Sequence, residues 1–189
     1  GLSAGASAQD HKFVYAENGR LYFPDGEEVA LWGVNLQPCI SWESGLLRNA
    51  GVKKDPEVYK KMVDGALDEL EIMKCKVLRC HLTPADFTDE QGNLVETIYL
   101  DMLDYMISEA PGHGMYTYIN FLNHMGQGEV PQSFMFEVVR KSAAMGEKSG
   151  RSDVWLYRQA NLMFEDESLR CAKNYIRQLL TRVNPYNHL

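Results

Sequence analysis

Three apolar stretches, each followed by a longer stretch with helical periodicity, most restrict what this 189-residue sequence can fold into. The apolar stretches are residues 29–35, 77–81 and 115–122. The first of them is almost uninterrupted, which is typical of a strand that is covered on both faces, as in a parallel sheet. Strands that alternate with helices at this spacing favour right-handed strand–helix–strand units. The sequence therefore predicts an α/β fold built on a parallel sheet.

The helical stretches have recognisable signals at their ends. The first helix, predicted over 55–73, begins with an Asp-Pro pair, which suits an N-cap followed by the first turn. The second is predicted over 98–110 and ends at the Pro-Gly pair 111–112. The third is predicted over 166–183. Apolar residues recur every three or four positions in all three, which predicts one buried stripe on each helix.

Two dipeptides near the N-terminus, Asn18-Gly19 and Asp25-Gly26, predict tight hairpin turns because they accept a positive φ. We therefore expect a small β-hairpin layer before the first strand of the sheet. Residues 1–12 lack such a pattern and begin without Met. We interpret them as a disordered tail that is either a cloning remnant or the end left by signal-peptide cleavage. The second alternative would make the protein secreted or periplasmic.

The segment 123–165 separates the third predicted strand from the last predicted helix. A connection of roughly forty residues, even with some short helix inside it, is unusual in a compact domain and is often functional. Because it follows a strand, we place it on the rim at the carboxyl ends of the strands. It is a candidate lid or cleft wall.

Composition excludes several classes of function. The net charge of −7 argues against nucleic acid or an anionic membrane surface as a partner, because both attract clustered Lys and Arg. No apolar run approaches the ~20 residues of a membrane span. The sequence contains no Gly-rich phosphate loop, no Gly-x-Ser-x-Gly element and no His-Glu-x-x-His. The four cysteines lack the spacing of a metal site, and we expect them to be small buried residues: Cys39, Cys75, Cys80 and Cys171. We predict no cofactor and no metal.

An ordered set of short segments resembles the cellulase- and mannanase-type glycoside hydrolases with (β/α)8 barrels. The segment 19–35, which closes with Gly33-Val34-Asn35, is similar to the family's N-terminal hairpin and first strand. Further matches follow in the family's order at residues 68–74, 77–79, 103–107, 114–116 and 179–186. The resemblance covers nearly all of residues 13–186. It implies a fold of the (β/α) TIM-barrel type, with an N-terminal β-hairpin layer and about three βα units.

A complete eightfold barrel usually needs ~250 residues, so residues 13–189 are expected to form the N-terminal part of such a domain, a partial barrel. Three parallel strands leave two open edges and an uncovered inner face. We therefore expect either self-association or a missing C-terminal half.

The resemblance also implies a function. Members of the family hydrolyse β-linked glycosides with two glutamates, which a retaining mechanism holds ~5 Å apart. These glutamates belong to the fourth and seventh strands, so both are expected beyond Leu189, and this chain alone is expected to be inactive. Glu43, Asp86 and Glu129 lie on loops of other units and receive no catalytic role. A non-catalytic carbohydrate-binding module and a fragment that works only within an assembly remain open alternatives.

Seven residues are the predicted contacts to an oligo- or polysaccharide: Arg79, His81, His124, Asn35, Asn120, Trp42 and Trp155. Arg79 interrupts an apolar strand, and a buried arginine must be paired. The resemblance implies that it hydrogen-bonds the active-site glutamates; the alternative is a structural carboxylate. His81 shares a strand face with Arg79 and suits either a sugar hydroxyl or the backbone of a loop.

The remaining candidates lie at strand ends or on rim loops. His124 ends the third strand, where the resemblance implies a histidine that contacts substrate. Asn35 and Asn120 are amides that face either a ligand or their neighbours. Aromatic rings suit the apolar faces of sugars, or else they pack within their loops: Trp42, Phe87, Trp155 and Tyr157. A metal site made from His81, Asp86 and His124 is conceivable, but nothing in their spacing requires it.

Overall fold

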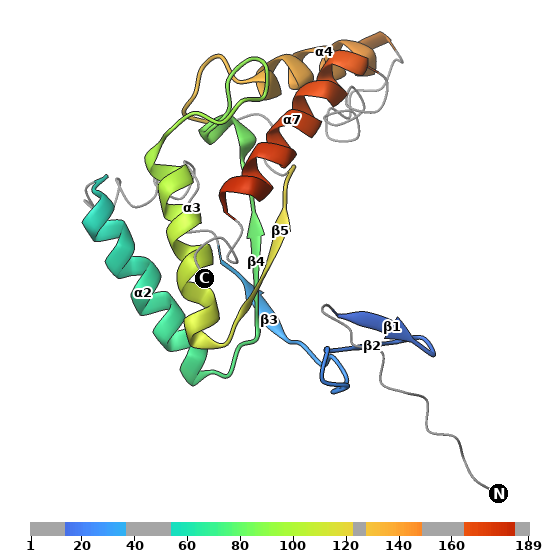
Figure 1. Ribbon diagram of the computed structural model, residues 1–189. Coiled ribbons are helices and arrows are strands. Elements are labelled where there is room, and N and C mark those ends of the chain that lie inside the picture. The colour runs from blue at the N-terminus through green and yellow to red at the C-terminus, as the bar shows by residue number, and fades with distance from the viewer. Residues whose placement is uncertain (1–13, 37–53, 123–127, 149–164, 184–189) are drawn as a thin grey trace, which may run out of the picture. The chain divides into compact units, whose positions relative to one another are not determined.

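The computed structural model describes residues 14–36, 54–122, 128–148 and 165–183. The chain divides into two compact units, Gly1–Trp32 and Gly33–Leu189, which we describe separately. The second unit is mixed α/β, and its described residues form a three-stranded parallel sheet and four α-helices (Figure 1). No helix in these ranges is long and apolar enough to cross a membrane.

The first unit contains a β-hairpin made by β1 (Tyr15–Glu17) and β2 (Arg20–Tyr22). Asn18 and Gly19 connect the strands with φ values of 49° and 77°, the positive values that the dipeptide predicts. A second turn at Gly26, with φ of 87°, returns the chain so that Glu28 bridges to Tyr22. Both predicted turns are confirmed.

The sheet of the second unit contains β3 (Gly33–Asn35), β4 (Val77–His81) and β5 (Tyr116–Asn120). The strand order is β3–β4–β5, and both pairs are parallel. The second and third predicted strands are confirmed.

The first predicted strand, over 29–35, is too long. The backbone N–H of Val29 donates to the carbonyl of Leu21 in the hairpin, at 2.8 Å, so this part of the chain does not pair with the sheet. Pairing with β4 begins at Gly33. A Cβ at Gly33 would lie 2.0 Å from the carbonyl oxygen of Val77, so this close approach requires a residue without a side chain.

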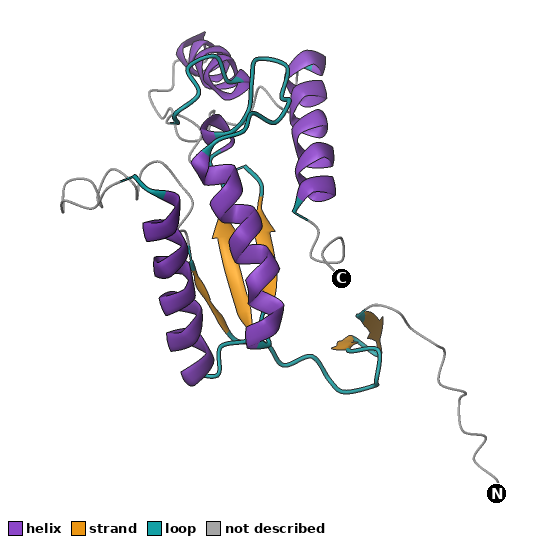
Figure 2. Cartoon of the chain, turned by 60° about the vertical axis from the view of Figure 1, so that its left-hand side comes forward, coloured by secondary structure: helices purple, strands orange, loops and turns teal. Residues whose placement is uncertain are grey.

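Helices α2 (Pro56–Ile72) and α3 (Ile98–Glu109) cover one face of the sheet (Figure 2). The carboxylate of Asp55 accepts hydrogen bonds from the backbone N–H of Glu57 at 2.9 Å and of Val58 at 3.4 Å, the expected N-cap. Beyond α3, the chain continues in the 3₁₀ helix η2 (Ala110–His113) and turns at Gly114, with φ of 69°. The predicted end of this helix before Pro111 is confirmed, since α3 ends at Glu109 and the chain continues only as a separate 3₁₀ turn with Pro111 in its first turn.

Two further helices complete the described part of the second unit, α4 (Phe134–Lys148) and α7 (Asp166–Arg182). The last predicted helix is confirmed by α7. The predicted loop 123–165 is corrected, since α4 is a 15-residue helix rather than a short one. The hydrophobic core joins all four helices to the buried face of the sheet. Cys75, Cys80 and Cys171 are buried within it as predicted, and Cys39 lies outside the described residues.

Strand alternation divides the sheet into a buried face and an open face. Leu78 and Cys80 point into the core, whereas Arg79 between them is exposed. Tyr116 and Tyr118 on β5 are 52% and 59% exposed. The four described ranges do not close into a barrel, and no helix within them covers the face that carries these three residues.

We predict that Leu103→Ala destabilises the protein by about 2–5 kcal/mol, because Leu103 is 1% exposed and its truncation leaves a cavity in the core. The matched control is Leu180→Ala on α7, where the side chain is 49% exposed, and we expect a change within about 0.5 kcal/mol. Urea unfolding followed by circular dichroism measures both. Equal effects of the two substitutions would contradict this assignment of the core.

Candidate functional site

The carboxyl ends of the three strands bring four of the seven predicted residues into two adjacent rows on the open face. Asn35 pairs with Arg79, and Arg79 pairs with Tyr118 across the sheet. Two residues further along the strands, His81 pairs with Asn120. Parallel pairing places partners on the same side of a sheet, so these side chains face one region.

Arg79 is exposed, which corrects the expectation that it is buried and must be paired. Its Nη1 donates to Oδ1 of Asn35 across 3.5 Å, a long hydrogen bond to a neutral group. Its guanidinium carbon lies 5.9 Å from the ring centre of Tyr118, within the range of a cation–π contact. Among the residues that the structure describes, no carboxylate forms an ion pair with Arg79. Within these described residues, the contact to Asn35 is the hydrogen bond that the guanidinium makes, out of its five N–H donors.

His81 and Asn120 form the second row. Nδ2 of Asn120 lies 3.3 Å from Nδ1 of His81. This contact is a hydrogen bond across the row whose direction depends on the tautomer of the histidine. Both side chains are half-buried, and the Nε2 atom of His81 is itself buried, so the geometry of this row is restrained.

The other predicted residues are not brought to these rows. Trp42, His124 and Trp155 lie outside the described residues, as does Tyr157. Phe87 is fully buried, and its ring centre lies 6.0 Å from that of Tyr175 in the core. Of the two alternatives for Phe87, packing inside the protein is the one observed, because the loop after β4 folds inward at this residue.

The loop after β4 is joined to the segment after β5. It begins with the 3₁₀ helix η1 (Pro84–Asp86), and the buried carboxylate of Asp86 accepts a hydrogen bond from the backbone N–H of Glu129 at 3.1 Å. The N–H of Val130 donates to the carbonyl of Ala85 at 2.8 Å. Glu129 in turn accepts hydrogen bonds from Tyr99, at 3.1 Å, and from Lys54, at 3.1 Å. These contacts of Asp86 and Glu129 hold the rim of the sheet together.

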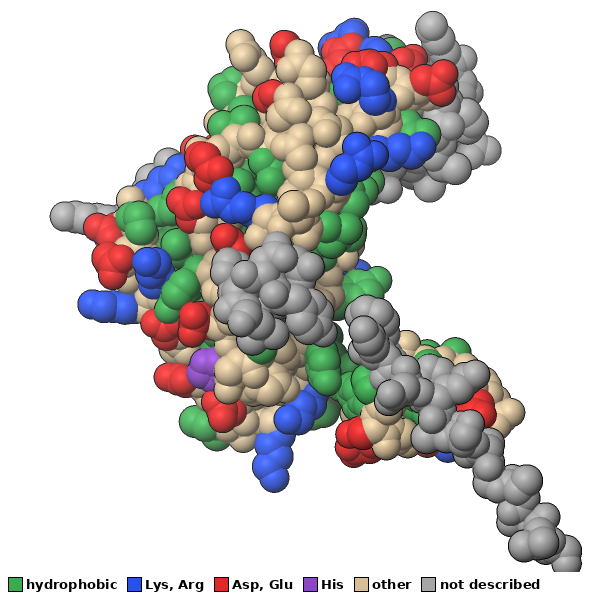
Figure 3. Space-filling model, viewed as in Figure 1, with side chains coloured by type: hydrophobic (Ala, Val, Ile, Leu, Met, Phe, Trp, Pro, Cys, Tyr) green, Lys and Arg blue, Asp and Glu red, His purple; other side chains and the backbone are tan. Residues whose placement is uncertain are grey.

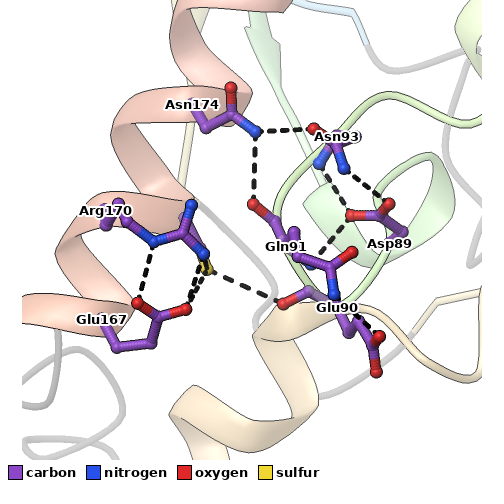
Figure 4. Close-up of polar contacts among 8 residues, drawn as sticks. Asp89, Glu90, Gln91, Asn93, Glu167, Arg170 and Asn174 are labelled. Atoms are coloured by element: carbon purple, nitrogen blue, oxygen red, sulfur yellow. Dashed lines mark hydrogen bonds and ion pairs between the residues drawn. The ribbon is translucent and has the colours of Figure 1, made fainter.

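A tight turn over residues 89–94 continues this rim, and Asp89 organises it (Figure 4). The Asp89 carboxylate accepts hydrogen bonds of 2.8 Å from the backbone N–H of Gln91 and from both the backbone and side-chain nitrogens of Asn93. Oδ1 of Asn93 accepts from Asn174 at 2.8 Å and from Gln178 at 3.1 Å. The turn is thus fixed to one face of α7.

Close backbone packing reinforces this contact. Gly92 has φ of 74°, and a Cβ there would lie 2.2 Å from the carbonyl oxygen of Cys171. The Cys171 thiol faces the carbonyl oxygen of Glu90 at 3.7 Å, while Arg170 forms a two-pronged contact with Glu167 beside it (Figure 4). We did not predict this cluster from the sequence. The turn residues 89–93 and the four-residue spacing of Asn174 and Gln178 are the signals that could have indicated it.

A hollow of about 430 Å³ lies between this turn, α4 and α7. Its lining includes Glu90, Phe134, Lys141 and Glu167, and none of the seven predicted residues takes part. It is a feature of the rim that is separate from the rows of Arg79 and His81.

No protein-family model matches the chain, and no curated protein matches it. Among solved structures, the chain is similar to the crystal structure of the endo-1,4-beta-mannanase from Rhizomucor miehei, with 14% sequence identity and a TM-score of 0.58. The match covers 94% of this chain and 44% of the mannanase chain, so this chain spans less than half of that enzyme's length. At this identity the likeness concerns the fold and supports a distant relationship.

We predict opposite effects for two Gly→Ala substitutions. Gly92→Ala should destabilise the protein by about 2 kcal/mol or more, because the methyl group meets the backbone of α7 and the positive φ adds strain. Gly65→Ala, inside α2 with no atom within 4 Å of the added methyl, should stabilise it by about 0.5–1 kcal/mol. Thermal and urea unfolding of both variants measures the sign of each change in the free energy of unfolding. If Gly92→Ala leaves the stability unchanged, the contact of this turn with α7 is contradicted.

Acid should weaken this turn through Asp89. Burial by itself would raise the pKa of the Asp89 carboxyl, but hydrogen bonds from Asn93, Gln91 and Gly92 outweigh it and lower the pKa below its ordinary value. The unfolded state then binds more protons just below pH ~3.9, so this contribution to stability is complete above that pH and disappears as the pH falls through the folded-state pKa.

The measurement is the free energy of unfolding between pH 6 and pH 2 for the wild type and for Asp89→Asn. We expect the free energy of unfolding to fall less for the variant than for the wild type as the pH is lowered below about 4. Identical slopes for the two proteins would show that Asp89 does not contribute.

Proposed function

We propose that this chain is the N-terminal portion of a glycoside hydrolase-like protein of the (β/α) TIM-barrel type. The observation that supports this most strongly is the fold likeness to an endo-1,4-beta-mannanase over 94% of the chain. The order of segments in the sequence supports the same assignment independently, since it resembles the cellulase- and mannanase-type enzymes. In this proposal the parent protein hydrolyses β-linked glycosides by a retaining mechanism with two glutamates.

Both catalytic glutamates lie outside this chain in the proposal. Arg79 is suited to support them, because it lies near the carboxyl end of β4, where barrel enzymes build their sites. Its described contacts are a 3.5 Å hydrogen bond to Asn35 and the ring of Tyr118, and neither neutralises its charge. A carboxylate brought to this face would gain a charge-assisted hydrogen bond from the guanidinium.

An oligo- or polysaccharide is the proposed ligand of the same face. Asn35 and Asn120 offer amide groups to sugar hydroxyls, and the exposed ring of Tyr118 offers an apolar surface to a sugar ring. His81 stays a proposed contact through Nδ1, because its Nε2 atom is buried. His124, Trp42 and Trp155 stay proposed contacts from the sequence. Secretion also remains a proposal.

The second candidate is a fragment that works only as part of an assembly, and the open face favours it. A parallel sheet is normally covered on both sides, whereas here Tyr116, Tyr118 and Arg79 are exposed on one. Either a C-terminal half or a second copy of the chain would supply the missing layer.

We predict that the 189-residue chain does not hydrolyse β-mannan, cellulose or an aryl β-glycoside. Reducing-sugar and chromogenic assays of the wild type, Arg79→Ala and Arg140→Ala check this. Arg140 is an exposed arginine on α4 that pairs with Glu137, which makes it the matched control. Clear turnover that is lost in Arg79→Ala and kept in Arg140→Ala would overturn the claim that the catalytic carboxylates lie elsewhere.

Sugar binding is tested separately with manno-oligosaccharides in an NMR titration. We expect weak binding, and we expect Asn120→Ala to raise the dissociation constant about fivefold to tenfold, in line with the loss of one hydrogen bond. Arg140→Ala should leave the dissociation constant unchanged. Binding that is equally strong in Asn120→Ala would remove the second row of the sheet from the proposed site.

We also predict that the isolated chain self-associates at high concentration, because its open face carries two exposed aromatic rings, Tyr116 and Tyr118. Light scattering should report assemblies in the wild type and fewer of them in the double variant Tyr116→Lys, Tyr118→Lys. The control is Ile72→Lys, which changes an 81% exposed apolar residue at the end of α2. A strictly monomeric wild-type chain would count strongly against an uncovered sheet face.

A further inference from the structure

We propose that Asp68, Glu71 and His113 form a binding site for a divalent transition-metal ion. The three residues lie at the end of the second unit opposite the rows of Arg79 and His81. Asp68 and Glu71 belong to the last two turns of α2, which precedes β4, and His113 belongs to η2, which precedes β5. The site is therefore independent of the proposed glycoside hydrolase function.

The donor atoms are already close together. One carboxylate oxygen of Asp68, one of Glu71 and Nδ1 of His113 all lie within 4.8 Å of one another. Nδ1 of His113 is 2.7 Å from Oε2 of Glu71 and 3.9 Å from Oδ1 of Asp68. Ligand atoms around a tetrahedral zinc ion, each about 2.0–2.2 Å from the metal, lie roughly 3.3 Å apart. The observed spacings bracket this value, so small side-chain movements can complete the site.

Two packed elements hold these side chains in place. Asp68 and Glu71 are three residues apart on a helix and so share one face of α2. Gly114 and Met115 donate backbone hydrogen bonds to Pro111 and Ala110, at 3.0 Å each, and so fix the turn that carries His113. The His113 side chain is 21% exposed. The imidazole therefore needs little further ordering to bind an ion.

The charge around the cluster favours a cation. Two carboxylates on neighbouring positions of a helix repel each other, and the C-terminal end of a helix carries partial negative charge. The last turn of α2 contains no basic residue that would offset either effect. Lys76 brings a positive charge to the neighbouring turn, with its ammonium 3.5 Å from where a Cβ of Gly114 would lie. Figure 3 shows a histidine side chain among acidic side chains on this part of the surface.

The donor set indicates the class of ion. An imidazole nitrogen with two carboxylates suits Zn²⁺, Co²⁺ or Ni²⁺, whereas Ca²⁺ and Mg²⁺ prefer oxygen ligands alone. Water would fill the remaining positions. An ion there would join the end of α2 to the turn before β5, and binding to the folded state alone would stabilise the protein. Because the ion competes with protons for Nδ1 and the carboxylates, binding should weaken in mild acid.

The experiment is calorimetric titration of the chelator-treated chain with ZnCl₂ at pH 7.5, repeated with CoCl₂ under a visible absorption readout. We expect one saturable site per chain, with a dissociation constant on the order of micromolar, and a higher melting temperature with zinc. His113→Ala should weaken binding at least tenfold. Glu57→Gln, which removes a carboxylate from the first turn of the same helix, is the matched control and should bind like the wild type.

Two outcomes would overturn the proposal. One is the absence of saturable binding in the wild type, and the other is unchanged affinity in His113→Ala, which would mean that other histidines hold the ion. Circular dichroism verifies that each variant is folded. If His113→Ala does not fold, Glu71→Gln replaces it, because the Glu71 side chain is 57% exposed and tolerates substitution. The proposal then requires Glu71→Gln to weaken metal binding at least tenfold.

Discussion

Packing of one face of the parallel sheet against α2 and α3 is the constraint on which the rest of the second unit depends. Leu78 and Cys80 of the central strand are buried beneath these helices, and the core extends from them to all four described helices. Because successive side chains of a strand point to opposite faces of the sheet, Arg79, which lies between these two residues, points to the open face. The open face and the candidate site on it are therefore consequences of how the core is built.

Polar contacts hold the loops at the carboxyl ends of the strands in place. The loop after β4 is tied to the segment after β5 through Asp86, and the turn organised by Asp89 is tied to α7 through Asn93. Since these connections follow the strands that carry Arg79, His81 and Asn120, they restrain the positions of the candidate residues. A site at this edge of the sheet is therefore held by the loop after β4, the turn at Asp89 and α7, as well as by the strands.

Much of the local structure could be predicted from the sequence. The Asp55 N-cap, the Asn18-Gly19 turn and the strands around Arg79 and Tyr118 depend on residues a few positions apart, and they form as expected. Predictions that depended on distant packing were less successful. Phe87 is buried against Tyr175, eighty-eight positions further along the chain, and α4 forms inside a segment that we predicted to be mostly loop.

The sequence by itself determined where α2, α3, α7, β4 and β5 form, because capping, turn chemistry and apolar periodicity act between near neighbours. It also indicated that Asn35, Arg79, His81 and Asn120 lie near strand ends. The tertiary structure decided which of them meet, that Arg79 is exposed rather than buried, and that Gly92 lies against Cys171. It also placed His113 beside Glu71, 42 residues earlier in the chain. The physical reason is that such contacts depend on how helices and strands pack, and this packing is set by the whole core rather than by any local run of residues.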